Sequence, residues 1–165
     1  MSDVLRACGA TAIAVSRDEA ERLRFWSGRK NAFPASGRIS PDYMCMDSTI
    51  PRKRLSDILL AIAEMEKKYQ LRCANVFHAG DGNLHPNFIF EGPDVPAHVW
   101  EAADEMFNTA LRLGGTLTGE HGIGLLKRRW LEDEIGSRQY ELQVAIKKVF
   151  DPNGIMNPGK VFMPQ

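Results

Sequence analysis

Three of the four histidines in this 165-residue sequence lie in two short segments that also contain glycines and acidic residues. His78 and His85 bound the first segment, and Glu120-His121 lies between two glycines in the second. Two imidazoles and one carboxylate are a common ligand set for a catalytic divalent metal that keeps an open coordination position. The pattern therefore predicts metal binding by His78, His85 and Glu120, with His121 beside them. The alternative is that His78 and His85 are hydrogen-bonded residues of a hairpin.

The first segment separates two apolar runs and contains an Asp-Gly pair, which indicates a β-hairpin because glycine tolerates the positive φ of tight turns. Side chains alternate between the two faces of a strand. An antiparallel hairpin therefore places His78, His85 and Asn87 on one surface near the turn. Pro86 has no amide donor, so we expect the strand ladder to be interrupted there or to face an edge.

The elements that must position these residues alternate between helix and strand. Ser16 and Glu19 form a capping box, which predicts a helix that ends near Gly28. Residues 31–42 are rich in Gly, Pro, Ser and Asn and are predicted to form a loop. The other strands and helices follow from apolar periodicity; we expect strands at about 10–15, 43–49, 73–79, 84–90 and 115–118, and helices at about 3–8, 51–70, 97–113, 125–135 and 137–151.

The fold class follows from the order β-α-β-β-α-β between about residues 43 and 118. This order with a central hairpin predicts an α+β fold, a ferredoxin-like antiparallel sheet with helices on one face, followed by C-terminal helices. In the last helix, four apolar residues at helical spacing are expected to face inward: Leu142, Ala145, Ile146 and Val149.

Charge and composition exclude some partners. The chain has 21 basic and 21 acidic residues, so nothing predicts binding to nucleic acid or to an anionic membrane. The short basic cluster at residues 127–129 is expected on a helix surface, paired with the acidic residues 132–134. Three cysteines without CxxC spacing indicate a reducing compartment. With no signal peptide and no apolar run near the ~20 residues of a membrane span, we expect a cytoplasmic protein.

Seven segments carry a resemblance to a known family, and they span nearly the whole chain. The segments are Phe25-Trp-Ser-Gly-Arg-Lys30, Pro41-Asp-Tyr43, Asp47-Ser-Thr-Ile-Pro51, Asn75-Val-Phe-His-Ala-Gly-Asp-Gly-Asn-Leu-His-Pro86, Gly119-Glu-His-Gly122, Phe150-Asp-Pro and Asn157-Pro-Gly-Lys160. With these segments the chain resembles the C-terminal part of the FAD-linked oxidases of the vanillyl-alcohol oxidase superfamily, and within it the glycolate oxidases.

The resemblance implies the substrate and cap domain, over residues 1–165, of a flavoenzyme that oxidises glycolate or D-lactate to a 2-keto acid. FAD would be bound mainly by an N-terminal domain that these residues do not contain, and residues 1–15 would be a truncated first part of the sheet domain. The implied partners are a small 2-hydroxy acid and the FAD-binding domain or subunits of a glycolate oxidase-like complex. We expect the isolated chain to be inactive.

The resemblance also implies roles for single residues. His78, His85 and Glu120 match the ligands of a divalent metal, for which zinc is one candidate. Residues that match substrate contacts are Arg29, Asn87 and His121. An arginine suits a carboxylate through its bidentate fork, but taken alone Arg29 reads as a surface charge.

The resemblance also bears on two further pairs of residues, one near the flavin and one that concerns the choice of substrate. Asn157 and Lys160 could approach the flavin ring or could simply form a C-terminal turn. Relatives that take dicarboxylic acids have a lysine immediately after the residue matching Tyr43 and a threonine at the position of Phe33. Met44 and Phe33 occupy these positions here, which favours a small monocarboxylate.

Two other functions remain open from the sequence. One is a free-standing metallohydrolase with a His-His-Glu site, although no HExxH motif is present. The other is a non-catalytic interaction module that pairs, in a homo-oligomer, through an open sheet edge.

Overall fold

The computed structural model describes residues 1–40 and 42–163, so Pro41 of the predicted loop lies outside the described residues. The chain divides into two compact units, Met1–Ile39 and Ser40–Gln165. Each unit is described by itself.

The first unit consists of helices α1 (Ser2–Ala7) and α2 (Glu19–Ser36). The N-cap of α2 is Asp18, whose side chain accepts a hydrogen bond from the Glu21 amide at 2.8 Å, so the predicted Ser16 capping box was wrong. The predicted end near Gly28 was also wrong, because one interior glycine costs only about 1 kcal/mol. Consequently the first part of the predicted loop is helical. Residues 10–15, all within the described part, form no strand.

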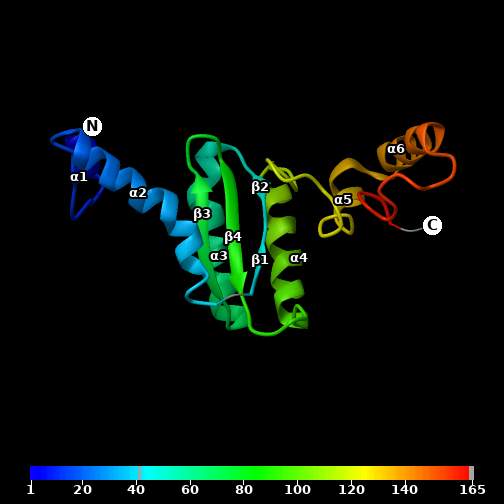
Figure 1. The fold of residues 1–165 in the computed structure, drawn as a ribbon, viewed down its shortest axis with the longest axis horizontal. Coiled ribbons are helices and arrows are strands. Elements are labelled where there is room, and N and C mark those ends of the chain that lie inside the picture. The colour runs from blue at the N-terminus through cyan, green and yellow to red at the C-terminus, as the bar shows by residue number, and fades with distance from the viewer. Residues whose placement is uncertain (41, 164–165) are drawn as a thin grey trace. The chain divides into compact units, whose positions relative to one another are not determined.

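The second unit contains the sheet (Figure 1). Its elements are β1 (Tyr43–Cys45), β2 (Ser48–Thr49), the short 3₁₀ helix η1 (Arg52–Arg54), α3 (Leu55–Tyr69), β3 (Arg72–His78), β4 (Asn83–Ile89), α4 (Ala97–Arg112), α5 (Leu131–Ile135) and α6 (Ser137–Phe150). Strand β4 is central: β3 pairs with it on one side, and β1 and β2 pair with it in succession on the other. All pairs are antiparallel.

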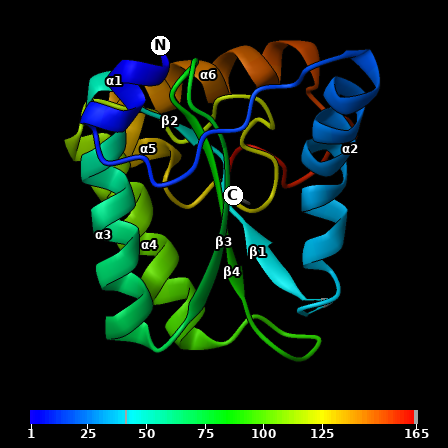
Figure 2. The same ribbon diagram turned by 90° about the vertical axis from the view of Figure 1, so that its left-hand side faces the viewer.

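Helices α3 and α4 lie side by side and pack on one face of this sheet (Figure 2). The core between them takes Leu84 and Phe88 from β4 and Met44 from β1. From the helices it takes Ile58, Ile62, Val99, Met106 and Phe107. The α+β fold with an antiparallel sheet and helices on one face is therefore confirmed.

Two expected elements differ from the prediction. The expected strand at 115–118 is reduced to a single bridge between Thr116 and Thr49. The strand does not continue beyond this bridge, because the next backbone amides donate to a buried carboxylate instead of to a neighbouring strand. The helix expected at 125–135 is limited to α5.

Helix α6 forms as predicted, but its apolar stripe does not face inward. Leu142, Ile146 and Val149 are exposed, as is Ala145. Periodicity identifies the apolar face of a helix but not the surface that covers it. None of the helices among the described residues combines the length and apolar character needed to cross a membrane.

Candidate functional site

The hairpin brings the predicted residues to one face of the sheet. Val76 pairs with His85, and Ala74 pairs with Asn87, in the β3–β4 ladder. Opposed residues in an antiparallel pair share a face. His78, His85 and Asn87 therefore lie on the face opposite the α3–α4 core, and the predicted arrangement is confirmed.

Pro86 interrupts the neighbouring strand, also as predicted. Met46 donates its amide to the Pro86 carbonyl at 3.0 Å, but proline returns no hydrogen bond. The strand is broken at this point into β1 and β2, and the break includes Asp47. Asp47 consequently lies beside His85, with its Oδ1 3.9 Å from His85 Nδ1.

Asp47 is a fully buried carboxylate that binds a whole loop. It accepts hydrogen bonds from the Thr118 hydroxyl at 2.6 Å and from the backbone amides of residues 119, 120 and 121 at 3.0–3.2 Å. Burial alone would raise its pKa, but these donors and Lys127 hold the pKa of Asp47 well below its usual range. The carboxylate therefore stays ionised and fixes the backbone that carries Glu120 and His121.

Lys127 is the cation that neutralises Asp47. Its ammonium group donates to Asp47 Oδ2 at 2.9 Å, to the Asp47 carbonyl at 2.8 Å and to the Leu117 carbonyl at 3.0 Å. Lys127 is only 3% exposed, so the prediction of a helix-surface cluster paired with residues 132–134 was wrong. Arg129 of the same cluster lies near Asp104.

Glu134 of α5 anchors the start of the same loop. It accepts hydrogen bonds from the Thr116 hydroxyl at 2.5 Å and from the Leu117 amide at 2.9 Å. At Gly119 a Cβ would lie 2.2 Å from Thr49 Oγ1, so only glycine permits this approach to the sheet. Residues 116–121 are thus held from both ends.

This loop places Glu120 over the two hairpin histidines. Glu120 Oε1 lies 3.7 Å from His78 Nε2, and Glu120 Oε2 lies 3.4 Å from His85 Nε2. Ligand atoms of the three residues all lie within 4.8 Å of one another. His85 is buried, and within the described part of the chain its Nδ1 has no hydrogen-bond partner. Burial lowers the pKa of His85, which favours the neutral imidazole that can act as a ligand.

His121 approaches His85 as well. The two rings are stacked, with centroids 5.0 Å apart and planes inclined by 20°. Adjacent residues in an extended strand point to opposite faces, but Glu120 and His121 both lie next to His85 because the loop here is not extended. His121 is exposed and is not a member of the His78–His85–Glu120 set.

Comparison with known proteins gives this arrangement a family. The model of the family described as "FAD linked oxidases, C-terminal domain" matches residues 1–161. The chain belongs to this family.

The curated relatives of this FAD-linked oxidase domain include oxidases and dehydrogenases. The chain is 48% identical to the glycolate oxidase subunit GlcD of Escherichia coli (strain K12) over 97% of its length and 32% of that protein. It is 36% identical to GlcD of Bacillus subtilis (strain 168), over 93% of the chain and 33% of that protein. It is 35% identical to a mitochondrial D-lactate dehydrogenase [cytochrome] of Arabidopsis thaliana, over 87% of the chain and 26% of that protein. The FAD-linked oxidase domain thus spans about a third of the relatives' length or less.

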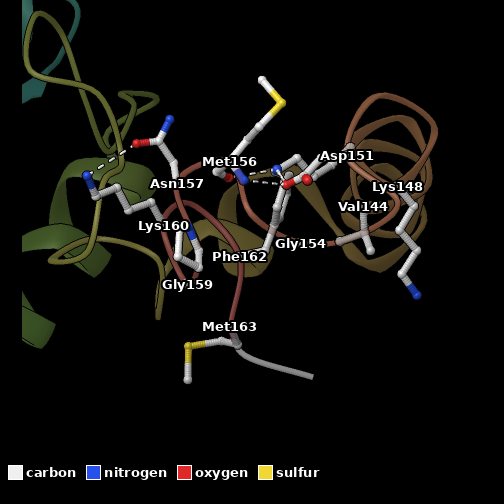
Figure 3. A pocket seen from close by; sticks show the side chains of 12 residues that line it. Val144, Lys148, Asp151, Gly154, Met156, Asn157, Gly159, Lys160, Phe162 and Met163 are labelled. Carbon is white, nitrogen blue, oxygen red and sulfur yellow. Dashed lines mark hydrogen bonds and ion pairs between the residues drawn. The ribbon is translucent and has the colours of Figure 1, made fainter.

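The remaining predicted residues of the FAD-linked oxidase domain are Arg29, Asn157 and Lys160. Arg29 belongs to the first unit, with its guanidinium 5.6 Å from the ring centre of Trp26. Asn157 and Lys160 form a turn in which Lys160 donates its amide to the Asn157 carbonyl at 3.2 Å and its ammonium to Asn157 Oδ1 at 3.3 Å. The turn lines a cavity of about 370 Å³ that also includes Lys148 and Val144 of α6 (Figure 3).

Met44 does not lie where the selectivity argument requires. It pairs with Phe88 and is buried in the core, on the face opposite His85. The argument from Met44 was therefore wrong in its geometry. Phe33 lies in the first unit.

Proposed function

We propose that this FAD-linked oxidase domain is the substrate- and metal-binding part of a flavoenzyme that oxidises a small 2-hydroxy acid, glycolate or D-lactate, to a 2-keto acid. The observation that carries the proposal is the convergence of His78, His85 and Glu120 within 4.8 Å, from segments about forty residues apart. The names of the relatives, glycolate oxidase subunit and D-lactate dehydrogenase, support the reaction class.

The donor set fits a divalent metal. Two imidazole nitrogens and a carboxylate oxygen leave coordination positions open for a ligand. His85 Nε2 faces Glu120, and the loop that carries Glu120 is fixed through Asp47, so the set is preorganised. A bound metal would polarise the substrate hydroxyl and lower its pKa.

His121 is the residue we assign to the hydroxyl proton. It stacks beside His85 and remains outside the proposed ligand set, so its imidazole is not occupied by the metal and can accept the proton. Asn87 has a narrower role. Its Nδ2 already donates to the carbonyls of Ala74 and His85, so only the buried, unpaired Oδ1 remains available. Asn87 would therefore fix His85 and offer an acceptor.

A bound flavin would supply the acceptor for the hydride of the substrate α-carbon, and most of its binding site would belong to the FAD-binding domain. From this chain, Asn157 and Lys160 offer an amide and an ammonium group beside an open cavity. Arg29 offers a guanidinium group that can bind the substrate carboxylate through two parallel hydrogen bonds. The exposed apolar residues of α6 are a suitable surface for the FAD-binding domain or for another subunit of a glycolate oxidase-like complex.

Metal binding provides the direct test of the ligand set. The purified chain should bind about one divalent ion, and His85→Ala should weaken binding strongly, because it removes the central ligand. Calorimetric titration with Mn²⁺, a hard ion suited to imidazole and carboxylate ligands, measures both. His98→Ala is the matched control, because His98 is exposed on α4 and outside the cluster. Unchanged stoichiometric binding in a His78→Ala, His85→Ala double mutant contradicts the assignment.

The isolated chain is expected to purify colourless and to oxidise no 2-hydroxy acid. The reason is that flavin binding is assigned to a domain outside these residues. An absorbance scan of the purified chain and a dye-reduction assay with glycolate check this. Flavin retained at about one per chain would show that the domain assignment fails.

Substrate preference tests the reaction class. In an enzyme that includes the FAD-binding domain, glycolate or D-lactate should have a higher kcat/KM than D-2-hydroxyglutarate. The expectation now rests on Phe33 and on the named relatives, since Met44 faces the core. Steady-state comparison of the three acids decides it, and a preference for the dicarboxylate refutes it.

A further inference from the structure

A second group of metal-ligating side chains shares His85. Ligand atoms of Cys45, His85 and His121 also lie within 4.8 Å of one another. Cys45 pairs with Asn87 in the β1–β4 ladder, so its side chain lies on the same face as His85. Cys45 and His78 thus lie on this face on either side of His85. Of the two loop residues, Glu120 groups with His78 and His85, and His121 groups with Cys45 and His85.

Two observations show that these side chains are suited to a ligand. His85 is only 7% exposed, and its Nδ1 has no hydrogen-bond partner among the described residues. The Cys45 thiol donates a long hydrogen bond to the Met46 carbonyl, with the sulfur and the oxygen 3.9 Å apart. Burial raises the pKa of Cys45, and nearby Asp47 raises it further, whereas Lys127 lowers it.

We propose that Cys45, His85 and His121 form a thiolate-containing site for a thiophilic divalent cation such as Zn²⁺ or Cd²⁺. The thiol releases its proton to solvent as the sulfur–metal bond forms. Adjacent ligand atoms in a tetrahedral zinc site lie ~3.5 Å apart, given bond lengths of about 2.0–2.3 Å. Since no two ligand atoms are more than 4.8 Å apart, the group must contract by no more than about 1.3 Å, and the exposed His121 can supply that movement by rotating about its side-chain bonds.

Sharing His85 makes the two sites exclusive of each other, and this part rests on the function proposed above. Harder ions such as Mn²⁺ prefer carboxylate and imidazole ligands, whereas thiolate ligands select softer ions. A hard ion should therefore occupy His78–His85–Glu120, and a thiophilic ion should occupy Cys45–His85–His121. In the second state His85 and His121 are both ligands, so the proposed base is no longer available and the ion inhibits.

The test uses Cd²⁺ and Mn²⁺ on the 165-residue chain. At one equivalent of Cd²⁺ the wild type should show sulfur-to-cadmium charge-transfer absorption, and a ¹¹³Cd NMR shift in the range of one sulfur ligand. Cys45→Ser should lose both signals, whereas Cys8→Ser and Cys73→Ser should retain them because these cysteines lie outside the cluster. Saturating Mn²⁺ should raise the apparent Cd²⁺ dissociation constant in proportion to its free concentration.

The outcomes separate the two proposals. A wild-type chain without the sulfur signal, or a Cys45→Ser chain that keeps it, overturns the thiolate site. Independent binding of the two ions overturns the sharing of His85. Mn²⁺ binding, measured by the loss of the free-ion EPR signal, should weaken in Glu120→Gln. If Mn²⁺ does not bind while the cadmium signal appears, the His78–His85–Glu120 assignment fails and the thiolate site stands.

Discussion

Asp47→Ala is expected to lower the free energy of unfolding of this chain by about 3–5 kcal/mol, the range for removing one partner of a buried ion pair. The substitution leaves the Lys127 ammonium buried beside carbonyls alone. It also leaves the amides of residues 119–121 without their acceptor. Both losses fall on the loop that carries Glu120 and His121, so metal affinity should fall with stability.

Lys127→Met should cost less than Asp47→Ala. Without Lys127 the carboxylate still accepts hydrogen bonds from Thr118 and from three backbone amides. Urea denaturation measures both variants, followed by the fluorescence of Trp100 and Trp130 in a Trp26→Phe background. Asp57→Ala is the control, because its ion pair with Arg54 is exposed and such pairs contribute about 0–1 kcal/mol. Equal small losses in all three variants would show that Asp47 does not organise the loop.

The stabilisation by Asp47 should also depend on pH. Its folded-state pKa lies below its ordinary value of about 3.9, so the stabilisation is complete above that value and is lost as the pH falls towards the folded-state pKa. The difference in stability between the wild type and Asp47→Ala should therefore be constant near neutral pH and shrink below about pH 4.

The hairpin could be predicted because its determinants are local. An Asp-Gly pair between apolar runs specifies the turn, and period-two alternation then places His78, His85 and Asn87 on one face. Pro86 could be interpreted for the same reason, since a missing amide has consequences at its own position. Glu120 could be named as a third ligand from its residue type and its flanking glycines, but the residues that bring it to this face could not.

The determinants of the loop lie far apart in the sequence and could not be predicted. Asp47 binds amides about seventy residues later, and Lys127 lies eighty residues from Asp47. The available signal was an acidic residue inside a predicted strand, which needs a buried partner. Lys127 was hidden within a basic cluster that resembles an ordinary solvated surface. The apolar stripe of α6 was misread because periodicity does not identify the partner.

His121→Ala is expected to lower kcat by ~10²–10⁴-fold in an enzyme that includes the FAD-binding domain, the usual range for loss of a general base. Hydride transfer requires removal of the hydroxyl proton, and His121 is held beside His85 without belonging to the proposed ligand set. Its backbone amide is fixed by Asp47 at 3.0 Å, so the truncation should not move Glu120. Metal content should therefore stay near that of the wild type.

Comparison of kcat with KM distinguishes a base from a binding residue. A lost base lowers kcat and kcat/KM together, whereas a lost carboxylate contact raises KM and leaves kcat unchanged. His98→Ala should behave as wild type, because that histidine is exposed on α4. If His121→Ala keeps its kcat and only KM rises, the histidine binds substrate and another group takes the proton.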